Sequence, residues 1–316
     1  MQPRYRKHLP QLADRLFVTD GGLETTIVFH EGVDLPHFAA FDLFARAGGE
    51  AILDRYFARY ALLARAHEAG LVLESATWRA NPDWGARLGY DADALAKVQR
   101  RAITQLARIR ARYESAGSPI VVSGNLGPRG DGYRADARMS ASEAEKYHGA
   151  QVATFADTEA DMVAAFTMTY SHEAIGIVRA ARVHALPVAI SFTVETDGRL
   201  PSGETLADAI GRTDAETNAY AAYYMINCAH PSHFTGVLES GGAWRARIRG
   251  VRANASRRSH AELDASDTLD IGDPEALGRD YRALQSHLPK LTIMGGCCGT
   301  DHRHVEAICR ATCIAA

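Results

Sequence analysis

The stretch Met294-Gly295-Gly296-Cys297-Cys298-Gly299-Thr300, near the end of the chain, places two adjacent cysteines between glycines. It follows the short run 291–293, whose residues are typical of a β-strand. Glycines allow tight turns and close approach of the backbone, so both thiols are able to face one point. We therefore predict that Cys297 and Cys298 bind a metal and that a further ligand comes from elsewhere in the chain.

The same pattern of a short apolar, β-branched run, a polar or glycine turn and a longer segment with helical spacing recurs along the chain. The eight predicted strands are residues 17–19, 71–74, 120–123, 162–166, 188–192, 224–227, 250–253 and 291–294. Eight parallel strands are the number that closes a (β/α)8 barrel.

An open doubly wound sheet would produce the same alternation of strands and helices. The placement of the polar residues favours the barrel, because nearly every predicted strand is followed by a polar or glycine-rich cluster. All eight such ends meet over one opening in a barrel, whereas an open sheet brings only a pair of them together. We therefore expect an α/β fold with a single TIM barrel domain spanning residues 1–316.

Several predicted helices carry recognisable start signals. Ser140 with Glu143 has the spacing of a capping box, and Asp273 precedes a proline suited to a first helical turn. Ser171 and Thr205 are interpreted as N-caps in the same way.

The composition is that of an ordinary globular protein, with 316 residues, 47% hydrophobic and 23% charged. A net charge of −3 gives no general attraction to nucleic acid or anionic lipid, so we expect neither as a partner. The sequence contains no apolar run typical of a secretory signal or a membrane span, and we expect a cytoplasmic protein, in which an oligomer is possible. The five cysteines are predicted to be reduced thiols.

Cys228 is the best candidate for the third ligand. It follows the apolar run 224–226 and so lies at the end of the sixth predicted strand, level with Cys297 and Cys298 on the eighth. Three thiolates suit Zn²⁺ and leave a fourth position for a substrate or water. The alternative interpretation is that Cys228 is a small buried apolar residue.

Three regions of the chain resemble the zinc-dependent homocysteine S-methyltransferases: Gly295–Thr300, the step Asn227-Cys228, and the opening Asp20-Gly21-Gly22-Leu23-Glu24-Thr25. The loop 124–128 and Asn254 resemble further family features, and the resemblance extends from about Phe17 to the C-terminal helix. It implies a (β/α)8 barrel that binds Zn²⁺ through Cys228, Cys297 and Cys298.

Ligation by Zn²⁺ would deprotonate a small-molecule thiol acceptor, which then attacks a methyl group carried by a cationic donor. The resemblance implies homocysteine or a related thiol as the acceptor. The chain has no long extension after the zinc motif, and this favours a sulfonium donor similar to S-methylmethionine or S-adenosylmethionine over a betaine.

The resemblance also implies residues that bind the acceptor, with Asp20 as the partner of its ammonium group and as a catalytic residue alongside the three cysteines. The other residues predicted to contact substrate are Gly21, Thr25, Ser75, Thr77, Thr167, Glu195, Asn227 and Asn254. Trp78, Trp84 and Tyr133 are predicted to offer aromatic faces to a methylated cation.

Thr167 departs from the family pattern. It stands where the family commonly carries a glutamate that binds the acceptor's amino group, and a neutral side chain does not replace that anion. Glu195 or Glu24 is a candidate to compensate. Ser75-Ala76 likewise departs from the family's usual threonine-asparagine pair.

Other functions remain open on the sequence alone. One is the same chemistry with a changed acceptor or a betaine-type donor, and another is a lyase or hydrolase that uses zinc-bound water. The all-cysteine ligand set disfavours the latter. A third is a non-enzymatic homologue that holds zinc or binds a partner.

Overall fold

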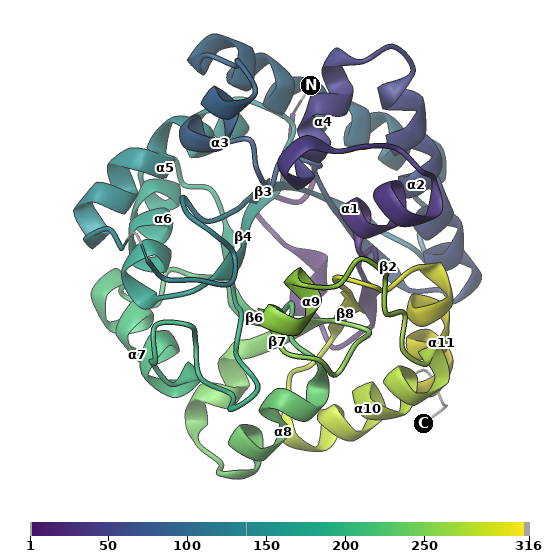
Figure 1. The fold of residues 1–316 in the computed structure, drawn as a ribbon, viewed down its shortest axis with the longest axis vertical. Helices are drawn as coiled ribbons and strands as arrows, with labels where there is room; N and C mark the ends of the chain where they lie inside the picture. The colour runs from purple at the N-terminus through teal and green to yellow at the C-terminus, as the bar shows by residue number, and fades with distance from the viewer. Residues whose placement is uncertain (1, 137, 313–316) are drawn as a thin grey trace.

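Eight parallel strands form a closed barrel at the centre of the computed structural model, which describes residues 2–136 and 138–312 (Figure 1). Each strand pairs with the next in sequence, and the last pairs with the first. The strands are β1 (Phe17–Val18), β2 (Gly70–Glu74), β3 (Ile120–Leu126), β4 (Met162–Met168), β5 (Val188–Phe192), β6 (Tyr223–Asn227), β7 (Ile248–Ala253) and β8 (Ile293–Gly296). The prediction of a TIM barrel is confirmed.

Helices surround the barrel, and the short α9 lies over its opening in the view of Figure 1. The helices are α1 (Leu23–Thr25), α2 (Gly49–Ala66), α3 (Pro82–Arg87), α4 (Ala92–Tyr113), α5 (Ala141–Ala156), α6 (Ser171–Val183), α7 (Leu206–Thr217), α8 (Pro231–Glu239), α9 (His260–Asp264), α10 (Pro274–His287) and α11 (His302–Thr312). We call the end of the barrel at the carboxyl ends of the strands the mouth, and the opposite end the base.

The predicted strands are all present, but their ends differ. β3 continues to Leu126 because residues 123–126 pair with β4 instead of forming a loop. β8 includes Gly295 and Gly296, which were predicted to follow the strand. A Cβ on Gly295 would lie 1.9 Å from Thr19 Oγ1, so this strand position in the crowded barrel accommodates only glycine.

Three of the four predicted N-caps are confirmed. Ser140 forms a reciprocal capping box with Glu143, and the side chains of Thr205 and Asp273 accept backbone hydrogen bonds at the starts of α7 and α10. The prediction for Ser171 was wrong. Ser171 is the first helical residue of α6, and its hydroxyl donates to Glu204 instead of capping the helix.

The core has two parts that follow from the alternation of side chains along each strand. Side chains such as Val72, Val121 and Met225 form a small cluster inside the barrel. The next residues along the same strands, among them Leu71 and Ile226, join a larger cluster between the strands and the helices. The barrel is therefore a packed core, and the strand ends at the mouth are left to form a site.

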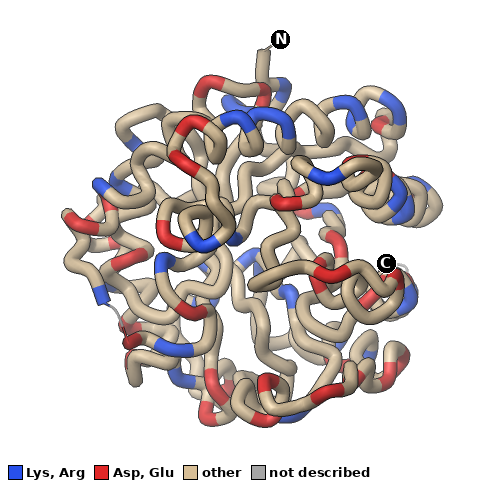
Figure 2. The backbone as a smooth tube through the Cα atoms, turned by 45° about the horizontal axis from the view of Figure 1, so that its top comes forward, with Lys and Arg blue, Asp and Glu red and all other residues tan. Residues whose placement is uncertain are grey.

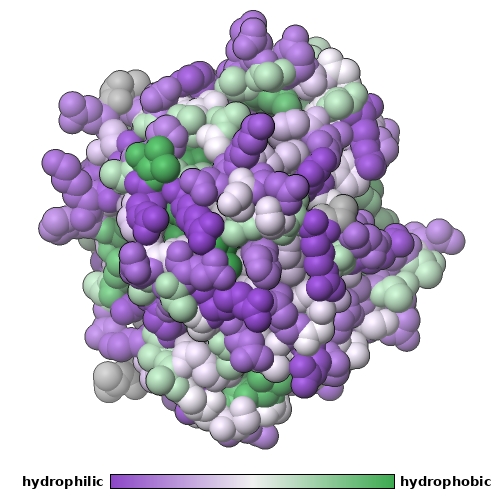
Figure 3. All heavy atoms as spheres, turned by 90° about the vertical axis from the view of Figure 1, so that its left-hand side faces the viewer, coloured by the Kyte–Doolittle hydropathy of each residue, from purple (hydrophilic) through white to green (hydrophobic). Residues whose placement is uncertain are grey.

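The outer surface carries charged and apolar residues in a mixed pattern. Acidic and basic residues are interspersed around the outer helices in Figure 2, and the face in Figure 3 is mostly hydrophilic with small separated apolar patches. In the described part of the chain, no helix has the length and apolar character needed to span a membrane.

Candidate active site

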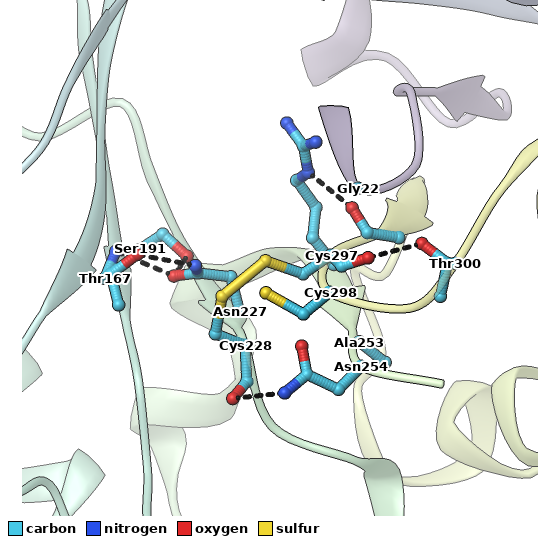
Figure 4. The surroundings of a disulfide bond; sticks show 12 residues. Gly22, Thr167, Ser191, Asn227, Cys228, Ala253, Asn254, Cys297, Cys298 and Thr300 are labelled. Carbon is cyan, nitrogen blue, oxygen red and sulfur yellow. Dashed lines mark hydrogen bonds between the residues drawn. A yellow bond between two sulfur atoms is a disulfide. The ribbon is translucent and has the colours of Figure 1, made fainter. Parts of the chain in front are cut away.

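The three cysteines predicted as metal ligands converge at the mouth. Cys228 directly follows β6, and Cys297 and Cys298 directly follow β8, with β7 between the two strands. Their three Sγ atoms all lie within 4.8 Å of one another. Figure 4 shows the sulfurs of the three side chains pointing toward one another from the two strand ends.

Two of these cysteines are not reduced thiols in this structure, contrary to the expectation from the sequence. Cys228 and Cys297 form a disulfide, with Cα atoms 5.4 Å apart (Figure 4). The physical reason is their convergence, because this Cα separation lies in the ordinary disulfide range. A metal requires both sulfurs as thiolates, so the disulfide and a metal-bound cluster are alternative states of one site.

The cluster suits Zn²⁺ by its donor set. In a tetrahedral thiolate site with Zn–S bonds of about 2.3 Å, the sulfurs lie roughly 3.8 Å apart. The three sulfurs already lie within 4.8 Å of one another, and reduction of the disulfide would let those of Cys228 and Cys297 move apart to this spacing. With Cys228 and Cys297 reduced, the three soft thiolates would hold the ion and leave room for a fourth ligand, as in catalytic zinc sites.

Three side chains in contact with one another, those of Tyr133, His260 and Glu195, support the cysteine cluster from one side. The Tyr133 hydroxyl lies 3.4 Å from Cys298 Sγ, and its ring stacks on His260 with centroids 4.0 Å apart. His260 in turn contacts the Cys228 carbonyl through Nε2 at 2.6 Å and Glu195 through Nδ1 at 3.2 Å. Burial raises the pKa of the Cys298 thiol, while the Tyr133 hydrogen bond acts in the opposite direction.

A cavity of about 490 Å³ opens beside the cysteines. The predicted residues that line it are Asp20, Gly21, Thr25, Ser75, Thr167, Asn227, Cys228, Cys297 and Cys298. The other three predicted residues are Thr77, Glu195 and Asn254, and none of them lines this cavity. Glu195 instead lines a separate depression of about 340 Å³, next to Tyr133.

Asp20 is buried and already has a cationic partner. Arg252 Nη2 donates to Asp20 Oδ1 at 2.5 Å, and the Tyr56 hydroxyl donates to Oδ2 at 3.1 Å. Burial raises the pKa of Asp20, whereas the charge of Arg252 lowers it. Asp20 therefore contributes little unpaired negative charge to the cavity.

Thr167 is held in an unusual conformation at the end of β4. Its φ of 62° lies in the left-handed region, which is rare for a β-branched residue and typical of strained functional positions. Asn227 holds it there, because Oδ1 accepts from the Thr167 N–H at 2.9 Å and Nδ2 donates to Thr167 Oγ1 at 3.1 Å (Figure 4). Ser191 also donates to Asn227 Oδ1.

Two of the predicted residues that do not line the cavity, Thr77 and Asn254, make hydrogen bonds to the backbone near the strand ends. Thr77 Oγ1 donates to the Asn125 carbonyl at 2.7 Å, and Asn254 Nδ2 donates to the Cys228 carbonyl at 3.0 Å. Asn254 thus orients the backbone of a cysteine in the cluster. Their roles in substrate binding remain predictions.

Sequence reasoning missed several charged residues that line the cavity, among them Glu74, Arg79 and Arg252. Glu74 is buried at the end of β2, and its Oε2 has no hydrogen-bond partner among the described residues. Burial raises its pKa to about 7, while Arg252 acts to lower it. The available signal was a charged residue within an apolar strand, as at Glu74 and Arg252.

The aromatic residues predicted to face a methylated cation already contact other groups. The Arg79 guanidinium carbon lies 4.1 Å from the Trp78 ring centroid and 3.8 Å from that of Trp84. Arg87 lies 4.1 Å from Trp84, and Tyr133 stacks on His260. Binding a cation to these rings would therefore compete with the cations present.

Comparison with known proteins points to one family. The model of the homocysteine S-methyltransferase family matches residues 17–312. A curated relative, homocysteine S-methyltransferase 4 of Zea mays, is 23% identical over 318 residues, which cover 93% of this chain and 88% of that protein.

Solved structures with a similar fold include two forms of the homocysteine methyltransferase MmuM from Escherichia coli. The oxidised form has a TM-score of 0.75 and 18% identity, with 96% of this chain and 99% of that chain covered. The metallated form has a TM-score of 0.73 and 18% identity, with coverages of 94% and 96%.

Proposed function

Because this chain belongs to the homocysteine S-methyltransferase family and is a methyltransferase, we propose that it transfers a methyl group from a sulfonium donor to a small-molecule thiol, homocysteine or a related one. The proposal depends on one observation above all, the convergence of the Cys228, Cys297 and Cys298 sulfurs at the cavity wall. These residues, once all three are thiolates, would hold Zn²⁺.

Zn²⁺ bound there would supply a Lewis acid that favours the thiolate form of an acceptor at neutral pH. In the transfer itself, the acceptor sulfur attacks the methyl carbon in line with the departing sulfur. A new sulfur–carbon bond forms as the donor's bond breaks, and the donor leaves as a neutral thioether. No protein nucleophile takes part.

The chain's own residues position the two reactants. The cavity encloses the reacting atoms and limits their access to water, which strengthens electrostatic interactions inside it. Six carboxyl groups line the cavity, against three guanidinium groups. They are Asp20, Glu24, Glu74, Asp131, Asp264 and Asp270, against Arg79, Arg87 and Arg252. Asp20 and Arg252 neutralise each other, and the excess of carboxyl groups among the others favours a cationic donor.

Metal content and methyl transfer test the proposal together. The protein, treated with a non-chelating reductant and loaded with zinc, should bind about one equivalent, and Cys298→Ser should abolish tight binding. Cys309→Ala, a buried residue of α11 that does not line the cavity, is the matched control and should retain the metal. Methylated thiol should be detected by mass with a sulfonium donor. Zinc below about half an equivalent in wild type, unchanged by Cys298→Ser, would exclude this function.

A further inference from the structure

Arg79 presents a guanidinium group to the cavity from the loop that follows β2. The residue is only 9% exposed, and its side chain is stacked between Trp78 and Trp84, as described above. Stacking between two indole rings fixes the plane of the guanidinium group and restricts its rotation. The side chain is therefore already ordered, and a ligand that binds it loses little further conformational entropy.

Most of the hydrogen-bonding capacity of Arg79 is unused within the described residues. Nη1 donates to the Gly130 carbonyl at 3.2 Å, and the buried Nε has no partner. No carboxylate lies within ion-pairing distance in the described part of the chain. Burial lowers the pKa of Arg79 to about 10, while Asp131 and Glu24 act to raise it, so the group stays charged at neutral pH. A guanidinium group has five N–H donors, so a fork that suits a carboxylate remains open.

Arg79 is free to bind an anion, whereas the residues expected to bind the ammonium group of the acceptor are already paired or are neutral. Asp20 is paired with Arg252, and neutral Thr167 stands at the position where the resemblance predicts a glutamate. The cavity next to the cysteines thus combines an available cation with an acceptor-binding carboxylate that is already neutralised.

We propose that Arg79 binds the carboxylate of the acceptor and that the acceptor is recognised as a mercaptocarboxylate, without a required α-ammonium group. This inference rests on the proposed function, because it assumes that the thiol binds at the cysteine cluster. Charge-assisted, bidentate hydrogen bonds to Arg79 orient the acceptor, so that its sulfur would face the cysteine cluster.

Three thiols of the same chain length distinguish the contribution of the carboxylate to binding from that of the ammonium group. They are 4-mercaptobutanoate, 3-mercaptopropylamine and L-homocysteine. Binding is measured on the reduced full-length protein loaded with Co²⁺ in place of zinc, through the thiolate-to-cobalt absorption, so that no donor is needed. Wild type should bind 4-mercaptobutanoate at least as tightly as L-homocysteine, and 3-mercaptopropylamine at least about tenfold more weakly.

Arg79→Gln should weaken both carboxylate-bearing thiols at least about tenfold and leave 3-mercaptopropylamine unchanged. Arg79→Lys should recover part of the loss, because it restores the charge but not the fork. Arg112→Gln is the control, since it removes an exposed arginine that stacks on Tyr113 and does not line the cavity, and it should have little effect.

Two results would overturn the inference. One is tight binding of 3-mercaptopropylamine with weak binding of 4-mercaptobutanoate in wild type, which would assign ammonium recognition to Glu24 or Glu74. The other is an equal loss for all three thiols in Arg79→Gln, which would make Arg79 a packing residue only. If cobalt binds but no thiol changes its spectrum, the proposed function itself fails, and the inference fails with it.

Discussion

Two buried arginine–aspartate pairs lie at opposite ends of the barrel, and they differ in their surroundings. At the base, Asp161 precedes β4 and accepts from Arg110 at 2.7 Å and from the backbone N–H groups of Tyr5 and Val122. At the mouth, Asp20 follows β1 and accepts from Arg252 and Tyr56. Both carboxylates are almost fully buried.

The difference lies in the charges around each pair. Asp161 is satisfied by one cation and two backbone donors, and it ties the N-terminal segment to β3 and β4. Around the mouth pair, Glu24 and Glu74 add acidic groups whose pKa values burial raises to about 7. The base is built for stability, whereas the mouth keeps charged groups that are costly for folding and available to ligands.

The largest expected effect tests the stabilising role of the base pair. Asp161→Asn leaves Arg110 buried without its partner charge, so the free energy of unfolding should fall by about 3–5 kcal/mol in urea titration. The folded fraction should still bind zinc. Asp157→Asn, in an exposed pair with Arg100, is the control and should change stability by less than about 1 kcal/mol. Similar losses in both variants would remove the contrast between base and surface.

The pH dependence of the free energy of unfolding tests whether the carboxyl group of Glu74 at the mouth is desolvated. The pKa of Glu74 is raised to about 7 in the folded protein, so its contribution is fully present below its usual pKa of about 4.5 and is lost as pH rises to 7. Between pH 4.5 and 8, the stability of Glu74→Gln relative to wild type should therefore rise by about 3 kcal/mol.

Glu262 provides a control of opposite sign for that experiment. Hydrogen bonds from Ser259 lower its pKa, so its contribution is present at neutral pH and is lost as pH falls. Glu262→Gln should accordingly lose stability at pH 8 relative to wild type. Unfolding midpoints measured across the same pH series report both variants, and a flat difference for Glu74→Gln would show that this carboxyl is not desolvated.

The smallest expected effect concerns the support of the metal ligands within the mouth. Tyr133→Phe removes the hydroxyl beside Cys298 Sγ, and zinc affinity in chelator competition should fall about tenfold, since second-shell partners tune their ligands. Tyr90→Phe removes a hydroxyl that donates to Asp42 away from the cavity. Equal zinc affinities for the two variants would mean that the contact with Cys298 does not affect metal binding.

The sequence by itself determined the order of the eight strands, three of the four helix caps considered, and the three cysteines that meet at one point. Strand periodicity and capping signals act over a few residues, so they are readable without tertiary structure. The cysteines were predictable because the carboxyl ends of all strands in such a barrel meet at one mouth. Their identity as ligands remains a prediction that the zinc experiment tests.

Only the tertiary structure decided which charges are paired. Asp20 and Arg252 are 232 residues apart in sequence, and nothing local indicates that one neutralises the other. Arg79 lies close in sequence to Trp78 and Trp84, but its stacking between their rings depends on how the loop after β2 and the start of α3 fold against the cavity. Electrostatic interactions depend on distance and burial in three dimensions, so the availability of a charge follows from packing and not from sequence spacing.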